Sequence, residues 1–216
     1  NEQRAMRWLA GVRQVDVLPL GVDSAFFRPE PVPFEAQTAV FWGRLDFGPN
    51  VQALEWFFAR VWPLVRQAAP LARITIIGFN PGPEVRTLAT IGGVSLVADL
   101  DDLRTEVHKH ALVVLPFVSG GGVKNKLLEA AAMGMPIVCT PLATQGLREV
   151  AEAPFAVGSS PSDLAAAMLG IWNDDARRAR LGEGARAWVV EHHTWEATAR
   201  KAIASLERSQ AKEAAS

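Results

Sequence analysis

The stretch VVLPFVSGGGVKNKLLEAAAMGMPIVCT, residues 113–140, connects two apolar runs through three consecutive glycines and a helical segment. The runs ALVVLP (111–116) and PIVCT (136–140) have the length and composition of buried strands. VKNKLLEAAAM (123–133) predicts a helix between them, with Gly134 at its C-terminal cap. A strand, a helix and a second strand in this order form one βαβ unit, which predicts a parallel sheet.

The same alternation continues on both sides of this unit. Strands are expected at 38–43, 72–78, 93–98 and 155–158, and VDVLP (15–19) has the pattern of a strand end. Helices are expected at 50–67 with a kink at Pro63, at 83–90, at 99–110, after the capping sequence SPSD (160–163), and at about 174–191 and 195–208. The strands are apolar throughout, so helices must cover both faces of the sheet. The sequence therefore predicts an α/β fold with a doubly wound, Rossmann-like parallel sheet of about six strands.

Composition excludes several classes of protein. The 216 residues carry a formal net charge of −1, which argues against the basic surface of a nucleic-acid-binding protein. The single cysteine, Cys139, lies within an apolar run, so we expect no disulfide framework. We expect instead a reducing, cytoplasmic location. No apolar run approaches the ~20 residues of a transmembrane helix. The chain starts at Asn1 rather than Met, which suggests a fragment of a longer protein.

The glycine loop has the features of an anion-binding site. Glycines between a strand and a helix let an anion approach the backbone, and the free amides at the helix start favour negative charge. Lys124 and Lys126 add positive charge there, although the whole chain has only five lysines. Glu129, about one turn further on, could accept hydrogen bonds from a ribose diol. Together they indicate a nucleoside diphosphate; the alternative is a tight turn followed by a solvated Glu.

Established phosphate-binding motifs do not fit this loop. A P-loop requires GxxxxGK[ST], and Gly122-Val123-Lys124 has neither the spacing nor the Ser or Thr. The dinucleotide motif GxGxxG would need glycine at Asn125 and would normally follow the first strand. A GxSxG nucleophile motif is also missing from the sequence.

Several motifs occur in an order that resembles a known family. They are LPLGVDSAFFRP (18–29), FWGRLDFGPN (41–50), WPLVRQAAPLARITIIGFNP (62–81), VSGGGVKNKLLEAAAMGMPIVCT (118–140) and ARAWVVEHHTWEA (185–197). The chain resembles the C-terminal, donor-binding domain of a GT-B glycosyltransferase of family 4 (group 1), in the glycine-rich-loop subgroup. The resemblance implies a retaining transfer of a sugar from a nucleotide diphosphate, with no metal ion or other cofactor.

The resemblance also implies which residues bind the donor. They are Gly43, Arg44, Gly120, Gly121, Gly122, Lys124, Lys126 and Glu129. Glu129 matches the second Glu of the family's E-x7-E motif, which binds the donor ribose. Arg44 faces the diphosphate in the family, and we expect Arg44 and Lys126 to stabilise the leaving diphosphate. For Arg44, a surface residue at a strand end is the alternative.

The sequence departs from the family pattern at two sites. The first Glu of E-x7-E falls at Gly121, which leaves the contact to the donor sugar undefined. The family's Lys about five residues after the Arg is missing, since Pro49 and Asn50 stand there. Lys124 or Lys126 is the candidate replacement for that cation.

A metal site is also considered. Asp99 and Asp101 form the Asp-x-Asp pattern that binds a metal ion in another class of sugar transferase. Here the pattern opens an expected helix, so capping of that helix is the preferred explanation. The histidines lie near expected helix ends, and no carboxylate is spaced to complete a metal site with them.

The expected domain organisation follows the resemblance. Residues 1–20 are expected to be a remnant of an N-terminal acceptor domain, 21–37 an interdomain linker, 38–193 the donor-binding domain and 194–216 a C-terminal helix and tail. The partners are then a nucleotide-sugar donor and the acceptor domain of the same polypeptide, with a glycan or lipid-linked acceptor, as in bacterial surface polysaccharide synthesis. The alternatives are a non-catalytic nucleotide-sugar-binding module and a sugar-nucleotide epimerase of the same fold. The donor base, the sugar, the acceptor and the oligomeric state are left open.

Overall fold

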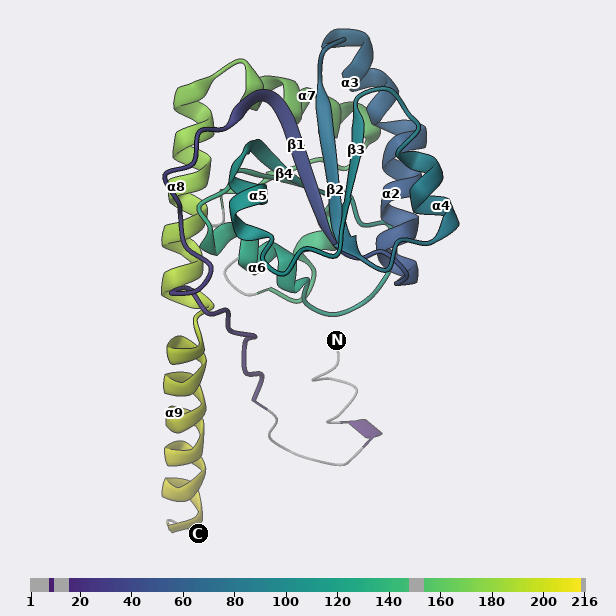
Figure 1. Ribbon diagram of the computed structural model, residues 1–216. Helices are drawn as coiled ribbons and strands as arrows, with labels where there is room; N and C mark the ends of the chain where they lie inside the picture. The colour runs from purple at the N-terminus through teal and green to yellow at the C-terminus, as the bar shows by residue number, and fades with distance from the viewer. Residues whose placement is uncertain (1–7, 10–15, 148–153, 215–216) are drawn as a thin grey trace.

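The computed structural model describes residues 8–9, 16–147 and 154–214, which form one open sheet with helices around it (Figure 1). The strands are β1 (Glu35–Arg44), β2 (Arg73–Phe79), β3 (Val94–Ala98), β4 (His110–Leu115), β5 (Ile137–Cys139) and β6 (Ala156–Val157). The helices are α2 (Gly48–Arg60), α3 (Trp62–Ala68), α4 (Pro83–Leu88), α5 (Arg104–His108), α6 (Asn125–Ala132), α7 (Pro161–Trp172), α8 (Asp175–His192) and α9 (Trp195–Ala214), with a 3₁₀ turn η1 (Pro141–Thr144).

All six strands run parallel in the order β3-β2-β1-β4-β5-β6. This confirms the predicted α/β, doubly wound, Rossmann-like fold. The two central strands have an apolar interior: β4 is buried along its whole length, and β1 is buried over its central residues. The strand order reverses between β1 and β4, and in such sheets the crevice at the reversal opens at the carboxyl ends of the strands.

The helices form two layers. Figure 1 shows α2 and α4 on one side of β1–β3 and α8 on the other. Contacts agree with this arrangement, because α2 packs against α3 and α4 whereas α6 packs against α8. The predicted capping sequence is confirmed at α7, where the Ser160 side chain accepts from the Asp163 amide and the Asp163 carboxylate accepts from the Ser160 amide.

Two of the predicted helices differ from the structure. The single kinked helix expected over 50–67 is two helices, α2 and α3, that meet at Val61, and Pro63 lies in the first turn of α3 where its missing amide costs no helical bond. The second correction concerns the helix expected over 99–110, which is reduced to α5.

The prediction that Asp99 and Asp101 cap that helix is wrong, because α5 starts only at Arg104. Asp99 has a φ of 56° and donates its amide to the Gly78 carbonyl at 3.1 Å, so the chain turns there instead of starting a helix. Asp102 is the residue that accepts from the Arg104 amide, at 3.0 Å.

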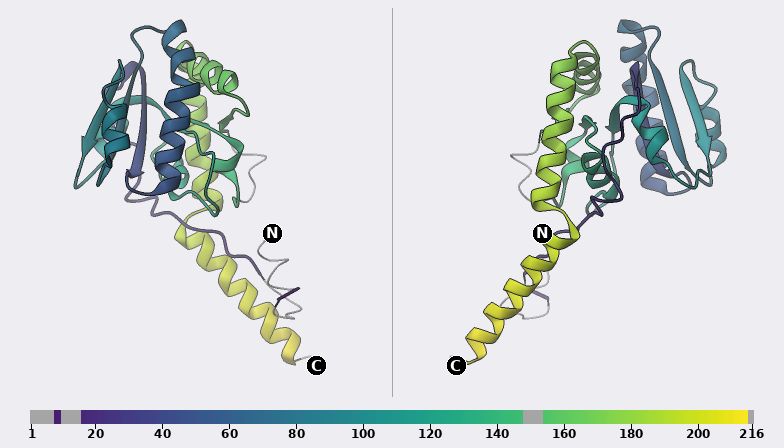
Figure 2. Two further views of the ribbon diagram at one scale, coloured as in Figure 1. Left: turned by 90° about the vertical axis from the view of Figure 1, so that its right-hand side faces the viewer. Right: turned by 60° about the vertical axis from the view of Figure 1, so that its left-hand side comes forward.

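The N-terminal segment lies along the junction of α8 and α9. Residues 16–19 form no strand, contrary to the strand end expected over 15–19; residue 15 and most of residues 1–10 lie outside the described residues. The segment is instead held by single contacts: Val22 donates to the His193 carbonyl at 2.8 Å, and Thr198 donates to the Pro19 carbonyl at 3.0 Å. Beyond this junction α9 extends away from the sheet (Figure 2).

Candidate functional site

The end of β1 and the first turns of α2 and α6 meet at the carboxyl edge of the sheet. Gly43 makes this possible because it has no side chain. A Cβ at Gly43 would lie 2.5 Å from Nζ of Lys126 and 2.9 Å from Nδ2 of Asn50. The sequence-predicted residues Gly43 and Lys126 are therefore immediate neighbours, and Asn50 joins them.

Lys126 is a half-buried lysine in the first turn of α6. Its Nζ donates to Oδ1 of Asn50 at 2.7 Å and lies 4.3 Å from the ring centre of Phe41 and 5.1 Å from that of Phe117. Burial is the largest cause that lowers the pKa of Lys126 to about 7; the nearby Glu129 opposes this shift, and Lys124 adds to it. A neutral amide and two aromatic faces hold the ammonium without cancelling its charge.

Glu129 lies one turn further along α6, and Trp42 fixes its position. Nε1 of the buried Trp42 donates to Oε2 of Glu129 at 2.9 Å. Burial raises the pKa of Glu129, whereas the bond from Trp42 and the nearby Lys126 lower it. An ionised carboxylate accepts about four hydrogen bonds, so the bond from Trp42 leaves capacity for a ligand.

The glycine loop is held by Lys124. Nζ of Lys124 donates to the carbonyls of Gly120 and Gly121 at 2.8 and 2.9 Å. Because the carbonyl and the next amide of a trans peptide point in opposite directions, the amides of Gly121 and Gly122 point away from Lys124. Gly120 and Gly122 have φ of 88° and 73°, values that favour glycine, and a Cβ at Gly121 would meet nothing within 4 Å. The loop thus offers amides and open space.

The starts of α2 and α6 both lie at this edge. In neither helix does a side chain cap the first turn, and neither first turn carries an acidic residue. In α2, Pro49 has no amide and the Asn50 amide donates to the Phe47 carbonyl, so α2 contributes mainly its dipole. The two helix dipoles favour an anion on the side where Lys126 lies.

Arg44 ends β1 and forms an ion pair with Asp46. Its Nη2 and Nε donate to the Asp46 carboxylate at 2.8 and 3.1 Å, and its side chain is 71% exposed. Asn80, after β2, donates to the same carboxylate at 3.0 Å. Hydrogen bonds from Arg44 and Asn80 lower the pKa of Asp46 to about 2. The role of Arg44 toward a diphosphate stays a prediction.

The part of the chain that the structure describes contains no group of three or more His, Cys, Asp or Glu side chains that could hold a metal ion. Among the same residues, no helix has the length and apolar character needed to cross a membrane.

Comparison with known families now decides the classification. Residues 36–174, more than half of the chain, match the sequence model of the glycosyl transferases group 1. The chain belongs to this family. No curated protein sequence matches it.

Solved structures share the fold of this group 1 glycosyltransferase chain at low identity. A TarM mutant from S. aureus, in complex with fondaparinux, alpha-GlcNAc-glycerol and UDP, is 14% identical with a TM-score of 0.73, over 94% of this chain and 41% of its own. Sucrose-phosphate synthase from Thermosynechococcus elongatus is 21% identical with a TM-score of 0.72, over 100% of this chain and 57% of its own. The chain thus spans about half the length of these structures.

A third structure is shorter. The C-terminal domain of a glycosyl transferase group 1 family protein (LpcC) from Francisella tularensis is 14% identical with a TM-score of 0.60. The match covers 81% of this chain and 100% of that domain.

Sequence reasoning missed three residues of the site in this glycosyltransferase chain. Asn50 was noted only as the residue that replaces a family lysine, Trp42 only as part of a strand, and Asp46 only as part of a motif. The roles of two of them depend on contacts between elements: Asn50 reaches α6 from α2, and Trp42 reaches α6 from β1. Short-range patterns carry no signal for such pairs.

We expect Lys126→Met to stabilise the ligand-free protein. The pKa of Lys126 falls from 10.5 to about 7 on folding. Between about pH 10 and pH 7 the unfolded chain therefore binds a proton at Lys126 that the folded chain does not bind. The unfolding free energy of the wild type decreases as the pH falls through this range. Met has no charge to bury, so its advantage in unfolding free energy should grow over this range, to at most about 5 kcal/mol at about 1.4 kcal/mol per pKa unit. Urea unfolding at pH 7, 8, 9 and 10 measures it.

Lys201→Met on α9 is the matched control, and its stability difference from wild type should stay constant over the same pH range. A constant difference for Lys126→Met as well would contradict the burial of a charged Lys126.

Proposed function

We propose that this chain is the C-terminal, donor-binding domain of a retaining glycosyltransferase, which transfers a sugar from a nucleotide diphosphate sugar to a glycan or lipid-linked acceptor of a bacterial cell surface. The observation that carries the proposal is the position of Lys126, Glu129 and the glycine loop together at the reversal of the strand order. That crevice is where ligands of doubly wound sheets bind.

The diphosphate would bind between the glycine loop and the starts of α2 and α6. The amides of Gly121 and Gly122 and the two helix dipoles supply partial positive charge, and Lys126 supplies a full charge. A diphosphate would in turn raise the pKa of Lys126 and keep it protonated. When the bond to the sugar breaks, negative charge develops on the diphosphate, and preorganised donors at that position stabilise it. Cleavage of the bond between the sugar and the diphosphate is therefore the step at which Lys126 would act.

The ribose would bind at Glu129. Trp42 holds one carboxylate oxygen, which orients the other acceptor sites of the group. A ribose diol offers two donors, and a single fixed carboxylate can accept both. Arg44 would reach the diphosphate by leaving Asp46, since its side chain is largely exposed.

The acceptor would bind to another domain of the same polypeptide. The domain of LpcC that the chain covers entirely is named a C-terminal domain, and the longer structures extend beyond the matched region. The surface of α9 would suit contact with such a domain: Ile203 and Leu206 are more than half exposed, and Val17 and Leu18 of the adjoining segment are exposed beside this helix.

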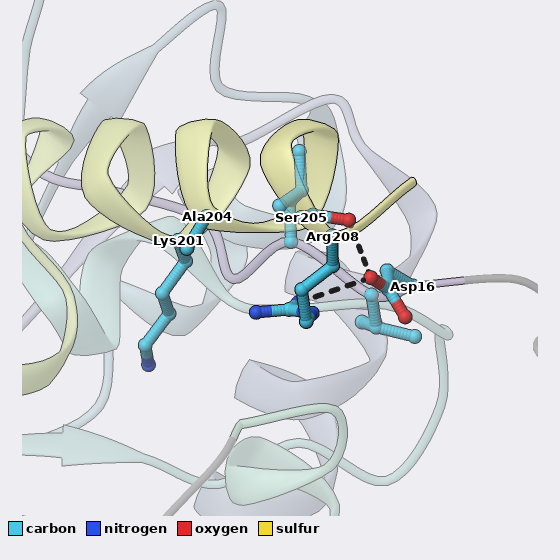
Figure 3. A pocket seen from close by; sticks show the side chains of 7 residues that line it. Asp16, Lys201, Ala204, Ser205 and Arg208 are labelled. Carbon is cyan, nitrogen blue, oxygen red and sulfur yellow. Dashed lines mark hydrogen bonds and ion pairs between the residues drawn. The ribbon is translucent and has the colours of Figure 1, made fainter. Parts of the chain in front are cut away.

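A pocket of about 410 Å³ lies between α9 and residues 16–18, and none of its lining residues belongs to the glycine loop (Figure 3). Asp16 crosses it to accept from Ser205 and, at 3.2 Å, from Arg208. We assign this region to packing against the proposed acceptor domain and not to the donor. The free thiol of Cys139, buried in β5, agrees with a reducing, cytoplasmic location.

The first test is binding. A thermal-shift screen of residues 1–216 against UDP-, GDP- and ADP-sugars, followed by calorimetry, identifies the base. A nucleotide-sugar should raise the melting temperature, and the free sugar alone should not. If none of the three nucleotides binds at millimolar concentration, the chain is not a donor-binding domain.

These 216 residues alone are expected to bind the donor but to transfer no sugar, because a single domain cannot orient an acceptor against it. Incubation with radiolabelled donor and glycan or lipid-linked acceptors, with and without the rest of the polypeptide, measures transfer. Transfer by residues 1–216 would contradict the two-domain arrangement. Binding without transfer by the longer polypeptide would favour the non-catalytic module.

Glu129→Ala tests the ribose contact. The substitution leaves both ribose hydroxyls without an acceptor, so affinity for the nucleoside diphosphate should fall by roughly 5–150-fold, equivalent to about 1–3 kcal/mol. A 2′,3′-dideoxy nucleotide never makes these bonds and should lose less. Calorimetric titration of wild type and variant with both ligands gives the comparison, and equal losses would remove Glu129 from the ribose site.

EDTA tests the absence of a metal cofactor. We expect the dissociation constant of the nucleotide-sugar to change little in EDTA, because Lys126 and backbone amides take the place of a cation. The same titration with Mg²⁺ or Mn²⁺ added back is the control. Binding that is lost in EDTA and restored by either metal would show that the diphosphate needs a metal ion.

A further inference from the structure

Asn50 connects three elements at the carboxyl edge of the sheet. It lies in the first turn of α2 and is only 6% exposed. Its Oδ1 accepts from Nζ of Lys126 in α6 at 2.7 Å, and its Nδ2 donates to the carbonyl of Arg44 at the end of β1 at 2.7 Å. A lysine ammonium only donates and a carbonyl only accepts, so these partners fix the orientation of the amide.

We propose that Asn50 is a positioning residue of the diphosphate site, which holds the Lys126 ammonium against Gly43 and ties it to the backbone at the end of β1. This inference rests on the proposed function of that site. It gives a role to the position at which the family's lysine is missing: Asn50 orients Lys126 of α6 and supplies no charge of its own.

The neutrality of the amide explains why Asn suits this position. An Asp would also accept from Lys126, but its negative charge would neutralise the ammonium and repel the Arg44 carbonyl. An Ala would leave the half-buried ammonium without this acceptor. Asn alone among these three orients the lysine and leaves its charge for an anion.

The charged groups near Lys126 lie on α6, just before α6 and at the end of β1. They are Glu129 on α6 itself, Lys124 at the start of that helix, and the Arg44–Asp46 pair at the end of β1. The first turn of α2 and the Phe117 segment contribute no charged side chain. Asn50 therefore contacts Lys126 without carrying a charge. Asn50→Ala and Asn50→Asp should shift the titration of Lys126 in opposite directions.

The first experiment follows Lys126 directly in the ligand-free protein. The five lysines can be labelled with ¹³C at Cε, and the Lys126 signal is assigned by its loss in Lys126→Met. We expect the Lys126 midpoint to fall by about half a pH unit or more in Asn50→Ala and to rise by a similar amount in Asn50→Asp. Gln52→Ala, an amide on the same helix that bonds to Ser119 instead, should leave the midpoint unchanged.

The second experiment measures affinity for UDP-glucose, whose diphosphate keeps a constant charge from pH 5 to 9. At pH 7 the affinity should fall about tenfold in Asn50→Ala, which loses a hydrogen bond to a charged group, and should also fall in Asn50→Asp, which pairs with the charge. Both variants should keep a cooperative thermal transition.

A midpoint that stays at the wild-type value in both folded variants would overturn the positioning role, and so would shifted midpoints with unchanged affinity. If the wild type binds no nucleotide-sugar, the proposed function fails. The lysine titration would still decide whether Asn50 holds Lys126.

Discussion

The site depends on the absence of a side chain at the end of β1. Gly43 of β1 and Gly78 of β2 are register partners in neighbouring strands, and neither position has room for a Cβ. A Cβ at Gly43 would lie 2.5 Å from Nζ of Lys126, and a Cβ at Gly78 would lie 1.9 Å from the Gly43 carbonyl oxygen. Any larger pair would push the lysine out or separate β1 from β2. Two glycines thus let α2, α6 and the sheet edge converge tightly.

This convergence has an energetic cost that a bound anion would offset. Burying an ammonium without a carboxylate partner destabilises a fold, and the lowered pKa of Lys126 expresses that cost. Phe41, Phe117 and Asn50 reduce the cost without removing the charge. A structural lysine would be better placed on the surface, as Lys109 is where it pairs with Glu106. Strained or costly electrostatics of this kind are typical of functional sites.

The sequence predicted what depends on local patterns and missed what depends on contacts between elements. Apolar runs located the strands because a strand buried on both faces needs no polar residue, and the SPSD sequence located the start of α7 because its capping bonds are local. The length of the helix expected over 99–110 was overestimated, because the spacing of apolar residues carries no information about the left-handed turn at Asp99. In the candidate site, the glycines and lysines stood out as a local pattern, and their binding of an anion stays a prediction. Asn50 and Trp42 were not, because their partners lie more than seventy residues away.

In the proposed site, the three cations at this edge differ in which interactions a diphosphate would have to displace. Arg44 is paired with a carboxylate that Asn80 also stabilises, so binding an anion there means breaking an ion pair. Lys124 holds the carbonyls of the glycine loop, and moving it would release the loop whose amides the ligand needs. Lys126 has a neutral acceptor and aromatic faces, so an anion gains its full charge without breaking an ion pair. The diphosphate should therefore bind first at Lys126, with Arg44 recruited only when the developing charge of the leaving group outcompetes Asp46.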